Sequence, residues 1–373
     1  MAGVGAARGR GRRTLTDTRA GARAATLRAA MLTRYAVRCR APLWARGGQA
    51  QTLLGFFLPV TGETLDPSLP GVTRHEILLD GEDRVVVFEA DPAPVGDQQR
   101  PLEGAVVHLF HGLTGSSDSN YVRLTASVMR SAGARVVAYN HRGQGAGAGL
   151  ARGFYHSGSD LDLFASVAAA RARHPGAPQL AVGFSLSANT LLLGAARRKE
   201  HPGLPDAILA VNPPARLSLA VRRMERGFNR VYDRNFVAGM RETLRVRRDL
   251  GWAGDDLVIP EGASVREADG LVTAPMAGYP DAEAYYADCS SAPRWPAVEV
   301  PAVVLSAADD PFISAEDMTS ATPGPRMLVH VEPTGGHLGY LSRAAPPIPG
   351  GTPRRWLGGA LLHHAVELRR ALG

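Results

Sequence analysis

The amino-acid sequence predicts an α/β protein with a mostly parallel central sheet flanked by helices. From Gly104 onward, short apolar runs that suit buried strands alternate with stretches that suit helices, which is typical of a parallel sheet built from strand–helix–strand units. About ninety residues then intervene, from 212 to 301, before the next apolar run. We therefore expect a core formed by residues 41–211 and 301–373, with residues 212–300 inserted as a helical cap or lid.

The elements follow from local patterns. Residues 41–60 mix aromatic, Gly and Gln residues without a clear period, and we expect them to wrap the core as an irregular arm. Strands at 76–79 and 84–90 flank an Asp-Gly turn signal, which predicts an antiparallel hairpin at the start of the sheet. The remaining predicted strands are 105–109, 135–139, 180–184, 207–211, 302–306 and 327–331, and the predicted helices are 121–132, 159–173, 190–199 and 361–372.

Composition indicates a folded protein with one basic segment. The 373 residues are 45% hydrophobic, which fits a large buried core and excludes disorder throughout. The net charge of +7 comes from residues 1–40, where ten arginines face the single acid Asp17. We expect this segment to be a disordered tail. It could instead bind polyanions through counterion release, or precede the true start if translation begins at Met31.

Other features predict a cytoplasmic protein without metal or cofactor. Only two cysteines occur, Cys39 and Cys289, and they lack the spacing of a disulfide framework or a zinc site. No run of about 18 apolar residues could form a transmembrane segment, and arginines occupy the region where a secretion signal needs its apolar core. We expect no nucleic acid as a partner, because the chain after residue 40 is close to neutral.

The segment 179–189 predicts the position of a nucleophile. A strand-length apolar run leads into Gly183-Phe184-Ser185-Leu186-Ser187 and then into a helix-forming stretch. A sharp turn between strand and helix exposes a serine hydroxyl beside a helix N-terminus, so Ser185 is the candidate nucleophile. Ser187 replaces the second glycine of the usual G-x-S-x-G pattern. We interpret it as a small residue that the turn tolerates, one step too far into the helix to be the nucleophile.

A serine hydroxyl needs a base and a group that orients the base. His337, in a glycine-rich loop after a predicted strand, is the candidate base. Asp309 and Asp310 follow another predicted strand and compete for the role of the acid, although either could instead cap a helix that begins near Ser314. We favour Asp310, because Asp-Pro followed by two apolar residues is common in such a loop. Loops at the carboxyl ends of parallel strands share one edge of the sheet, so these groups should meet Ser185 there.

The tetrahedral oxyanion of ester cleavage needs two backbone donors. One is expected from the residue after the nucleophile, which is Leu186. The other is expected from the glycine-rich loop His111-Gly112-Leu113, which follows the strand predicted at 105–109. We therefore predict an oxyanion hole formed by the amides of Leu113 and Leu186.

Together these motifs resemble those of the YheT-like α/β-hydrolases, a group of predicted esterases related to the mammalian ABHD lipases. The resemblance implies an α/β-hydrolase fold, carboxylic-ester hydrolysis and a catalytic triad of Ser185, Asp310 and His337. The chain departs from the family at Gln49, where a histidine is usual, and at Ala188, where a glycine is common. The matching motifs are Gly48-x-x-Gln51-Thr52, His111 to Ser116, Asn140-His141-Arg142-Gly143, Tyr155-His156-Ser157-Gly158, Gly183 to Asn189, Tyr285-Tyr286, Asp309 to Phe312 and Gly336-His337-Leu338-Gly339.

These observations predict a serine hydrolase that cleaves small-molecule or lipid-like carboxylic esters through an acyl-enzyme. The Met and Phe residues of the predicted cap favour an apolar acyl group. Two alternatives remain open at this point. An acyltransferase would use the same triad, and a non-catalytic binder of nucleic acid or of an anionic surface would act through the Arg-rich tail.

Overall fold

The structure is a computed structural model that describes residues 35–94 and 100–372. Of the tail predicted at residues 1–40, residues 1–34, including the alternative start at Met31, lie outside the described residues. The expectation of disorder was wrong for the end of this segment, because the amide of the buried Cys39 donates to Glu332 at 3.2 Å and the amide of Arg40 donates to the hydroxyl of Ser342 at 2.9 Å.

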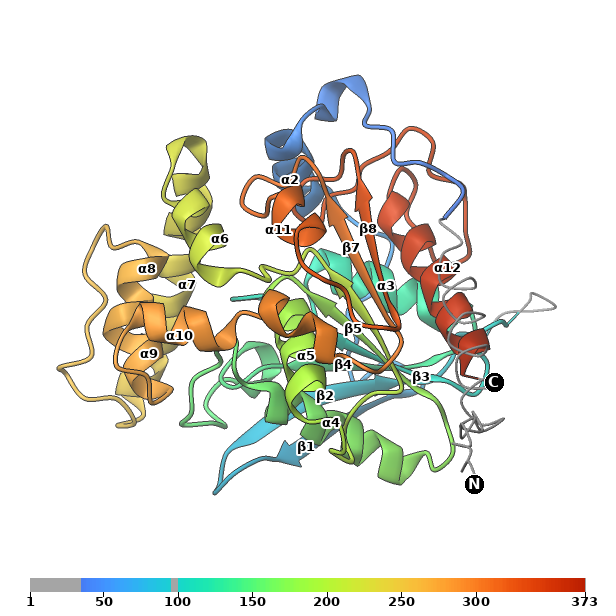
Figure 1. Ribbon diagram of the computed structural model, residues 1–373. Coiled ribbons are helices and arrows are strands. Elements are labelled where there is room, and N and C mark those ends of the chain that lie inside the picture. Colours follow the sequence, from blue (N-terminus) through green and yellow to red (C-terminus); the bar gives the residue numbers. More distant parts are fainter. Residues whose placement is uncertain (1–34, 95–99, 373) are drawn as a thin grey trace, which may run out of the picture.

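A mixed eight-stranded sheet forms the centre of the protein, in the order β1-β2-β4-β3-β5-β6-β7-β8 (Figure 1). The first two strands form the predicted antiparallel hairpin, and β2 also pairs antiparallel with β4. All later pairs are parallel, as predicted from the strand–helix alternation. The strands are β1 (Val72–Leu78), β2 (Arg84–Ala90), β3 (Val106–Phe110), β4 (Arg135–Asn140), β5 (Gln179–Phe184), β6 (Ala207–Val211), β7 (Ala302–Ala307) and β8 (Met327–Glu332).

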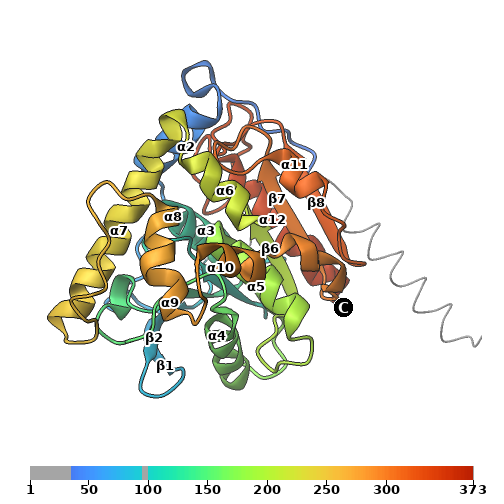
Figure 2. The same cartoon turned by 60° about the vertical axis from the view of Figure 1, so that its left-hand side comes forward.

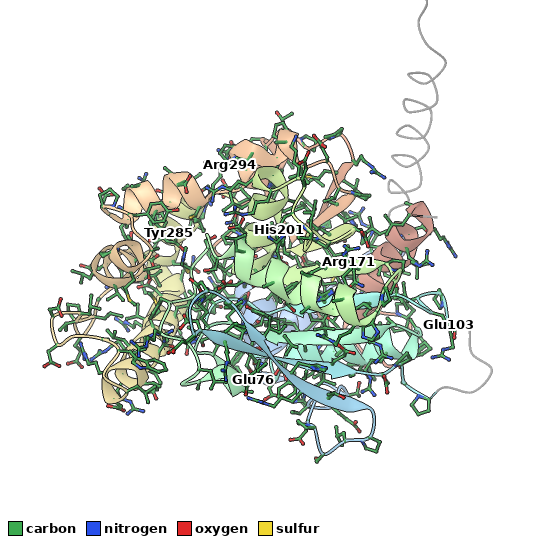
Figure 3. The ribbon with its side chains drawn as sticks, turned by 90° about the horizontal axis from the view of Figure 1, so that it is seen from below. Glu76, Glu103, Arg171, His201, Tyr285 and Arg294 are labelled. Atoms are coloured by element: carbon green, nitrogen blue, oxygen red, sulfur yellow. The ribbon has the colours of Figure 1, made fainter. Side chains whose placement is uncertain are left out.

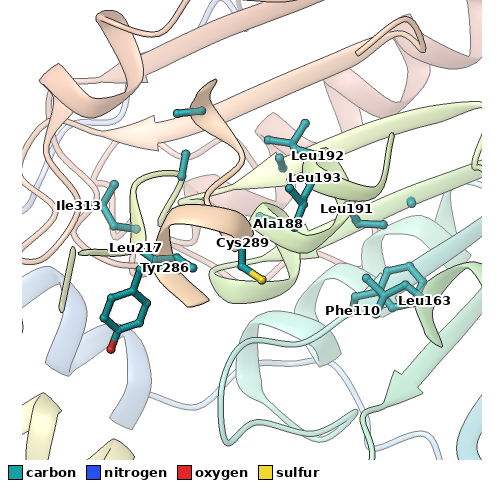
Figure 4. Packing of buried hydrophobic residues seen from close by; sticks show 14 of the residues in the cluster. Phe110, Leu163, Ala188, Leu191, Leu192, Leu193, Leu217, Tyr286, Cys289 and Ile313 are labelled. Atoms are coloured by element: carbon teal, nitrogen blue, oxygen red, sulfur yellow. The ribbon is translucent and has the colours of Figure 1, made fainter. Parts of the chain in front are cut away.

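Helices cover both faces of this sheet. α3 (Asn120–Ser131) packs against α12 (Trp356–Ala371) on one face, and α4 (Asp160–Arg173) packs against α5 (Leu186–Arg197) on the other (Figures 1 and 2). A hydrophobic core lies on each face of the sheet. Successive side chains of a strand point to opposite faces, so alternate residues of one strand belong to different cores. On β4, for example, Val136 joins the core beneath α3 and α12, whereas Val137 joins the core beneath α4 and α5 (Figure 4 shows part of the latter).

Residues 212–300 fold between β6 and β7 as a set of helices, for which we keep the name cap. Their apolar side chains join the core beneath α4 and α5. In Figure 1 the cap lies to the left of the sheet. It contains α6 (Leu217–Met224), η3 (Gly227–Asn229), α7 (Arg230–Asp249), α8 (Val265–Ala268), the π-helical turn η4 (Asp269–Thr273), α9 (Ala274–Met276), α10 (Ala282–Cys289) and η5 (Ala292–Ala297). The short elements η2 (Gly145–Gly147) and α11 (Ala315–Thr319) belong to loops of the core.

The expectation of an irregular arm at 41–60 was wrong. This segment forms a short turn, η1 (Leu43–Ala45), and a ten-residue helix, α2 (Gly48–Phe57). The buried face of α2 has helical spacing but consists of Gly and polar residues, so no apolar period reveals it. Its glycines allow contact with two loops. A Cβ on Gly48 would lie 1.5 Å from the carbonyl oxygen of Asp309, and one on Gly55 would lie 2.5 Å from the Cα of Gly339.

Candidate active site

Ser185 occupies a sharp turn between β5 and α5. Its backbone has φ 52° and ψ −118°, a region that non-glycine residues rarely adopt. The turn is tight, because a Cβ on Gly183 would lie 2.7 Å from the Leu191 side chain and 2.8 Å from the amide nitrogen of Ala188. The amide of Ser185 donates to the carbonyl of Val211 at the end of β6, at 2.9 Å. The sheet therefore holds the serine in this strained position, with its side chain partly exposed.

The structure brings Ser185, His337 and Asp310 together. The Oγ of Ser185 lies 2.9 Å from the Nε2 of His337, and the Nδ1 of His337 lies 2.8 Å from the Oδ2 of Asp310. A carboxylate only accepts hydrogen bonds, so Nδ1 carries the ring proton and Nε2 is the basic nitrogen that faces the serine. The ring of Phe312 lies 4.2 Å from the ring of His337, centroid to centroid, and covers it.

Asp310 lies in a network of donors. Its Oδ1 accepts the amides of Phe312 at 3.0 Å and Ile313 at 3.1 Å. Its Oδ2, which accepts from His337, also accepts from the Nδ2 of Asn212 at 2.7 Å. Asn212 directly follows β6 and is in turn fixed by the hydroxyl of Tyr340, at 2.8 Å. The sequence reasoning missed Asn212, although it follows a strand end in the same way as Asp310 does.

The competing acid, Asp309, has a different place. Its Oδ1 accepts the amides of Gly335 and Gly336, both at 2.8 Å, and its Oδ2 accepts the hydroxyl of Thr334 at 2.8 Å. These bonds fasten the loop that carries His337. Neither aspartate caps α11, because the side chain of Ser314 does so.

Helix α2 supports the same loop from the other side. The hydroxyl of Thr52 accepts the amide of His337 at 2.9 Å and donates to the carbonyl of Gly48 at 2.7 Å. Gln49, which stands where the family usually has histidine, points to the cap instead: its Oε1 accepts the hydroxyl of Tyr232 at 2.7 Å, and its Nε2 donates to Asn229 at 2.6 Å. The two contacts connect α2 to both the His337 loop and the start of α7.

The amides predicted to bind an oxyanion lie next to the serine. A Cβ on Gly112 would lie 3.1 Å from the Cβ of Ser185, so the loop after β3 runs directly against the nucleophile. Leu113, Leu186 and Ser185 line one cavity. In the part of the chain that the structure describes, neither leucine amide donates a hydrogen bond.

His111 holds the peptide group that carries the Leu113 amide. Its Nδ1 donates to the carbonyl of Gly112 at 2.7 Å, and its Nε2 accepts the amide of His141 at 3.2 Å. The carbonyl of Gly112 and the N–H of Leu113 belong to one planar peptide, so fixing the first fixes the direction of the second. Burial lowers the pKa of His111 to about 4, which keeps the ring neutral at physiological pH.

Ser187 is fully buried and bonded, whereas the usual pattern has glycine here. Its hydroxyl lies 2.7 Å from the Nε2 of His141 and 3.1 Å from the hydroxyl of Tyr155, and it donates to the carbonyl of His111. The rings of Tyr155 and His141 stack at 3.6 Å. The sequence predicted only that the turn tolerates a small residue, but the hydroxyl also ties α5 to the loop after β3.

Two cavities meet at Ser185. The narrow cavity, about 70 Å³, lies beneath the cap and is mainly apolar. The wide cavity, about 660 Å³, is lined by α2, the loop of residues 112–121 and the start of α7. Because both reach the serine, an ester bound there can place its acyl group on one side and its alcohol on the other.

Neither a metal centre nor a membrane span is found in the described ranges. Residues 35–94 and 100–372 contain no group of three His, Cys, Asp or Glu side chains that could hold a metal ion. Within these same ranges, every helix is too short or too polar to cross a bilayer.

Comparison with known proteins gives one family and several relatives. Residues 105–344 match the model of the alpha/beta hydrolase fold. YheT of Escherichia coli (strain K12), whose esterase assignment is provisional, is 28% identical over 323 residues, which cover 81% of this chain and 90% of YheT. The medium-chain fatty acid ethyl ester synthase/esterase 2 of Saccharomyces cerevisiae is 27% identical over 272 residues, which cover 66% of this chain but only 60% of the yeast protein.

Among solved structures, the Pyrococcus furiosus esterase Pf2001 superposes with a TM-score of 0.52. The two chains are 15% identical, and the match covers 85% of this chain and 99% of that one. At this identity the likeness concerns the fold alone.

The buried bonds of Ser187 predict the effect of restoring the usual glycine. Ser187→Gly removes a buried hydroxyl that bonds His141, Tyr155 and the carbonyl of His111, so we expect it to lower the free energy of unfolding by about 1–3 kcal/mol. Ser187→Ala should cost less, because it removes the same hydroxyl without adding glycine's backbone freedom. Urea denaturation measures both. A Ser187→Gly variant as stable as the wild type would show that the hydroxyl contributes nothing.

Proposed function

This chain belongs to the α/β-hydrolase family, and from that premise we propose that it hydrolyses carboxylic esters through an acyl-enzyme formed on Ser185. The predicted fold and the resemblance to the YheT-like esterases are confirmed. One observation carries the proposal: an unbroken chain of hydrogen bonds from Ser185 through His337 to Asp310. Beside the serine lie the amides of Leu113 and Leu186, which donate no hydrogen bond to any of the described residues.

The first half of the reaction forms the acyl-enzyme. As the Oγ of Ser185 attacks the ester carbonyl carbon, its proton moves to the Nε2 of His337. Asp310 stabilises the resulting imidazolium through Nδ1. The negative charge on the former carbonyl oxygen is bound by the amides of Leu113 and Leu186. When the tetrahedral intermediate collapses, the carbon–oxygen bond to the alcohol breaks and His337 gives its proton to the departing alcohol.

The second half releases the acid. A water molecule takes the place of the alcohol, gives a proton to His337 and attacks the acyl carbon. The bond to Ser185 then breaks, and the proton returns to Oγ. Asp310 keeps the orientation of His337 through both halves, because three further donors already fix its two oxygens.

The two cavities support an apolar acyl group. The narrow cavity is lined largely by apolar side chains of the cap and by Phe312 and Ile313. The wide cavity contains more polar groups, including Asp118, Asn120 and Gln144. We therefore place the acyl group beneath the cap and the alcohol in the wide cavity.

A second candidate function, acyl transfer to an alcohol, rests on the size of the wide cavity. An alcohol bound there can attack the acyl-enzyme in place of water with the same triad, and the yeast relative's name combines a synthase with an esterase. A role for the Arg-rich tail as a nucleic-acid binder concerns residues outside the described ranges, and no structural observation supports it.

Substitutions in the triad test ester hydrolysis. With p-nitrophenyl esters, Ser185→Ala should abolish turnover. Asp310→Asn should lower kcat on the order of 10³–10⁴-fold, because the amide no longer selects the correct His337 tautomer. Asp309→Asn is the matched control and should lose less, since Asp309 only fastens the loop. Unchanged turnover by a folded Ser185→Ala protein would refute the assignment.

The position of His111 predicts a second effect on rate. His111→Phe removes the donor to the Gly112 carbonyl and frees the peptide of Leu113, so kcat should fall by about 10–100-fold with KM little changed. The pH profile should keep its shape, since His111 is neutral across it.

His108→Phe is the control for the His111 variant. His108 is also buried and also has its pKa lowered to about 4 by burial, but it bonds Gln179, away from the oxyanion. This variant should lose stability without a matching loss of kcat. Equal losses of kcat in the two variants would contradict the role of His111.

Product analysis separates hydrolysis from transfer. If the wide cavity binds an alcohol, added short-chain alcohols should divert the acyl group into a new ester and raise the release of p-nitrophenol when deacylation is limiting. Chromatography of the products measures the ratio of new ester to free acid. If the ratio of new ester to free acid is no higher than the molar ratio of alcohol to water, the wide cavity has no binding site for the acceptor alcohol.

A further inference from the structure

The cap places one carboxylate on the wall of the narrow cavity. Asp269 begins the π-helical turn η4 and is 8% exposed. Its Oδ2 accepts the hydroxyl of Tyr286 at 2.7 Å. The hydroxyl of Thr273, one turn further along and also on the cavity wall, lies close enough to lower the pKa of the Asp269 carboxyl but makes no hydrogen bond of ordinary geometry. Among residues 35–94 and 100–372, Oδ1 therefore accepts no well-formed hydrogen bond, and no cation pairs with the side chain. A buried carboxylate with a single neutral donor is costly, so this arrangement needs a reason.

Two further polar side chains, those of His156 and Tyr285, line the same cavity. The Nδ1 of His156 accepts the amide of Gly158 at 3.1 Å, so the ring proton lies on Nε2. Burial lowers the pKa of His156 to about 4 and keeps the ring neutral. The hydroxyl of Tyr285 accepts the amide of Ser157 at 2.8 Å, and in the described part of the chain its own proton has no acceptor.

These polar groups form one continuous wall. The ring of His156 lies 6.1 Å from that of Tyr285, which lies 5.3 Å from that of Tyr286, the partner of Asp269. Figure 3 labels Tyr285 on the cap side of the molecule, and Figure 4 shows Tyr286 near Leu217 and Ile313. The remainder of the cavity is largely apolar, including Val221, Met224, Phe236 and Met240.

A purely structural role explains only half of this arrangement. Tyr286 needs one acceptor, and a neutral side chain or a carbonyl would satisfy it at a lower cost of burial. If the only role of Asp269 were to accept from Tyr286, its second oxygen would be a buried acceptor without a well-formed hydrogen bond. Asp269 lines a cavity that also reaches Ser185, where an acyl group would bind.

We propose that Asp269 accepts a hydrogen bond from a hydroxyl group on the acyl chain, and that the substrates are therefore esters of hydroxylated acids. This inference rests on the proposed ester hydrolysis. A hydroxyl both donates and accepts, so it can bond Asp269 while it accepts from His156 or Tyr285. An ammonium group would also suit Asp269, but it would face those two donors without an acceptor to offer them.

Paired substrates test the proposal. The substrates are p-nitrophenyl esters of short to medium acyl chains, each either unsubstituted or carrying one hydroxyl at a chosen carbon of the chain. For each hydroxyl position, the kcat/KM of the hydroxylated ester is divided by that of the unsubstituted ester. We expect a preference of about 10–100-fold for one position in the wild type, because a hydrogen bond to a buried charged group discriminates to that extent. In Asp269→Leu this ratio should fall to about one, and in Asp269→Asn it should fall part of the way.

Asp288→Leu is the matched control. Asp288 also lies in the cap and also accepts a tyrosine hydroxyl, from Tyr279 at 2.7 Å, but neither residue lines the narrow cavity. The ratio of kcat/KM for hydroxylated over plain esters should be the same in Asp288→Leu as in the wild type. If Asp269→Leu does not fold, Asp269→Asn carries the comparison. Calorimetric binding of hydroxylated and plain fatty acids to Ser185→Ala provides a measurement without turnover, and the hydroxylated acid should bind more tightly.

The outcomes separate this proposal from the one on which it rests. Ser185-dependent cleavage of plain esters with a ratio near one at every position would overturn the hydroxyl preference and leave ester hydrolysis intact. A stronger preference for an amino group than for a hydroxyl would also overturn it. Absence of any Ser185-dependent turnover would overturn both.

Discussion

The position of His337 depends on the packing of α2 against the loops that follow β7 and β8. Gly48 lies against the carbonyl of Asp309, and Gly55 lies against Gly339, so any side chain at these positions would push the helix away. From this close position Thr52 bonds the amide of His337. Asp309, which follows β7, accepts hydrogen bonds from the amides of Gly335 and Gly336 in the same loop. The distances from Ser185 to His337 and on to Asp310 therefore depend on a contact between residues 285 positions apart in sequence.

The same helix joins the triad loops to the cap. Gln49 of α2 bonds Asn229 and Tyr232, and Asn229 also donates to the carbonyl of Pro311, one residue after Asp310. A movement of the cap would therefore displace the loop that carries Asp310 and also change the cavities beneath the cap. The replacement of the family's usual histidine by Gln49 places an amide, which can donate and accept at once, at this junction.

Sequence alone predicted the sheet, its main helices and the meeting of Ser185, Asp310 and His337, because strand ends and glycine-rich turns leave local signals. It failed where the buried groups are not apolar. Helix α2 buries Gly and polar residues, which look irregular, and α12 begins at Trp356 rather than 361 because Gly358 and Gly359 weaken its helical pattern. Asp269 has no local signal, since its environment is assembled from separate parts of the chain.

The buried carboxylates differ in how completely they are paired, and the difference indicates their use. Asp162 bonds the guanidinium of Arg142 through both oxygens, as expected of an acid that only joins elements. Asp310 accepts four hydrogen bonds, which fix it beside His337. Asp269 accepts one, and its burial raises its pKa to about 6. Its ionised form therefore still predominates at neutral pH, and a hydroxyl from the substrate would supply the donor that this charge lacks.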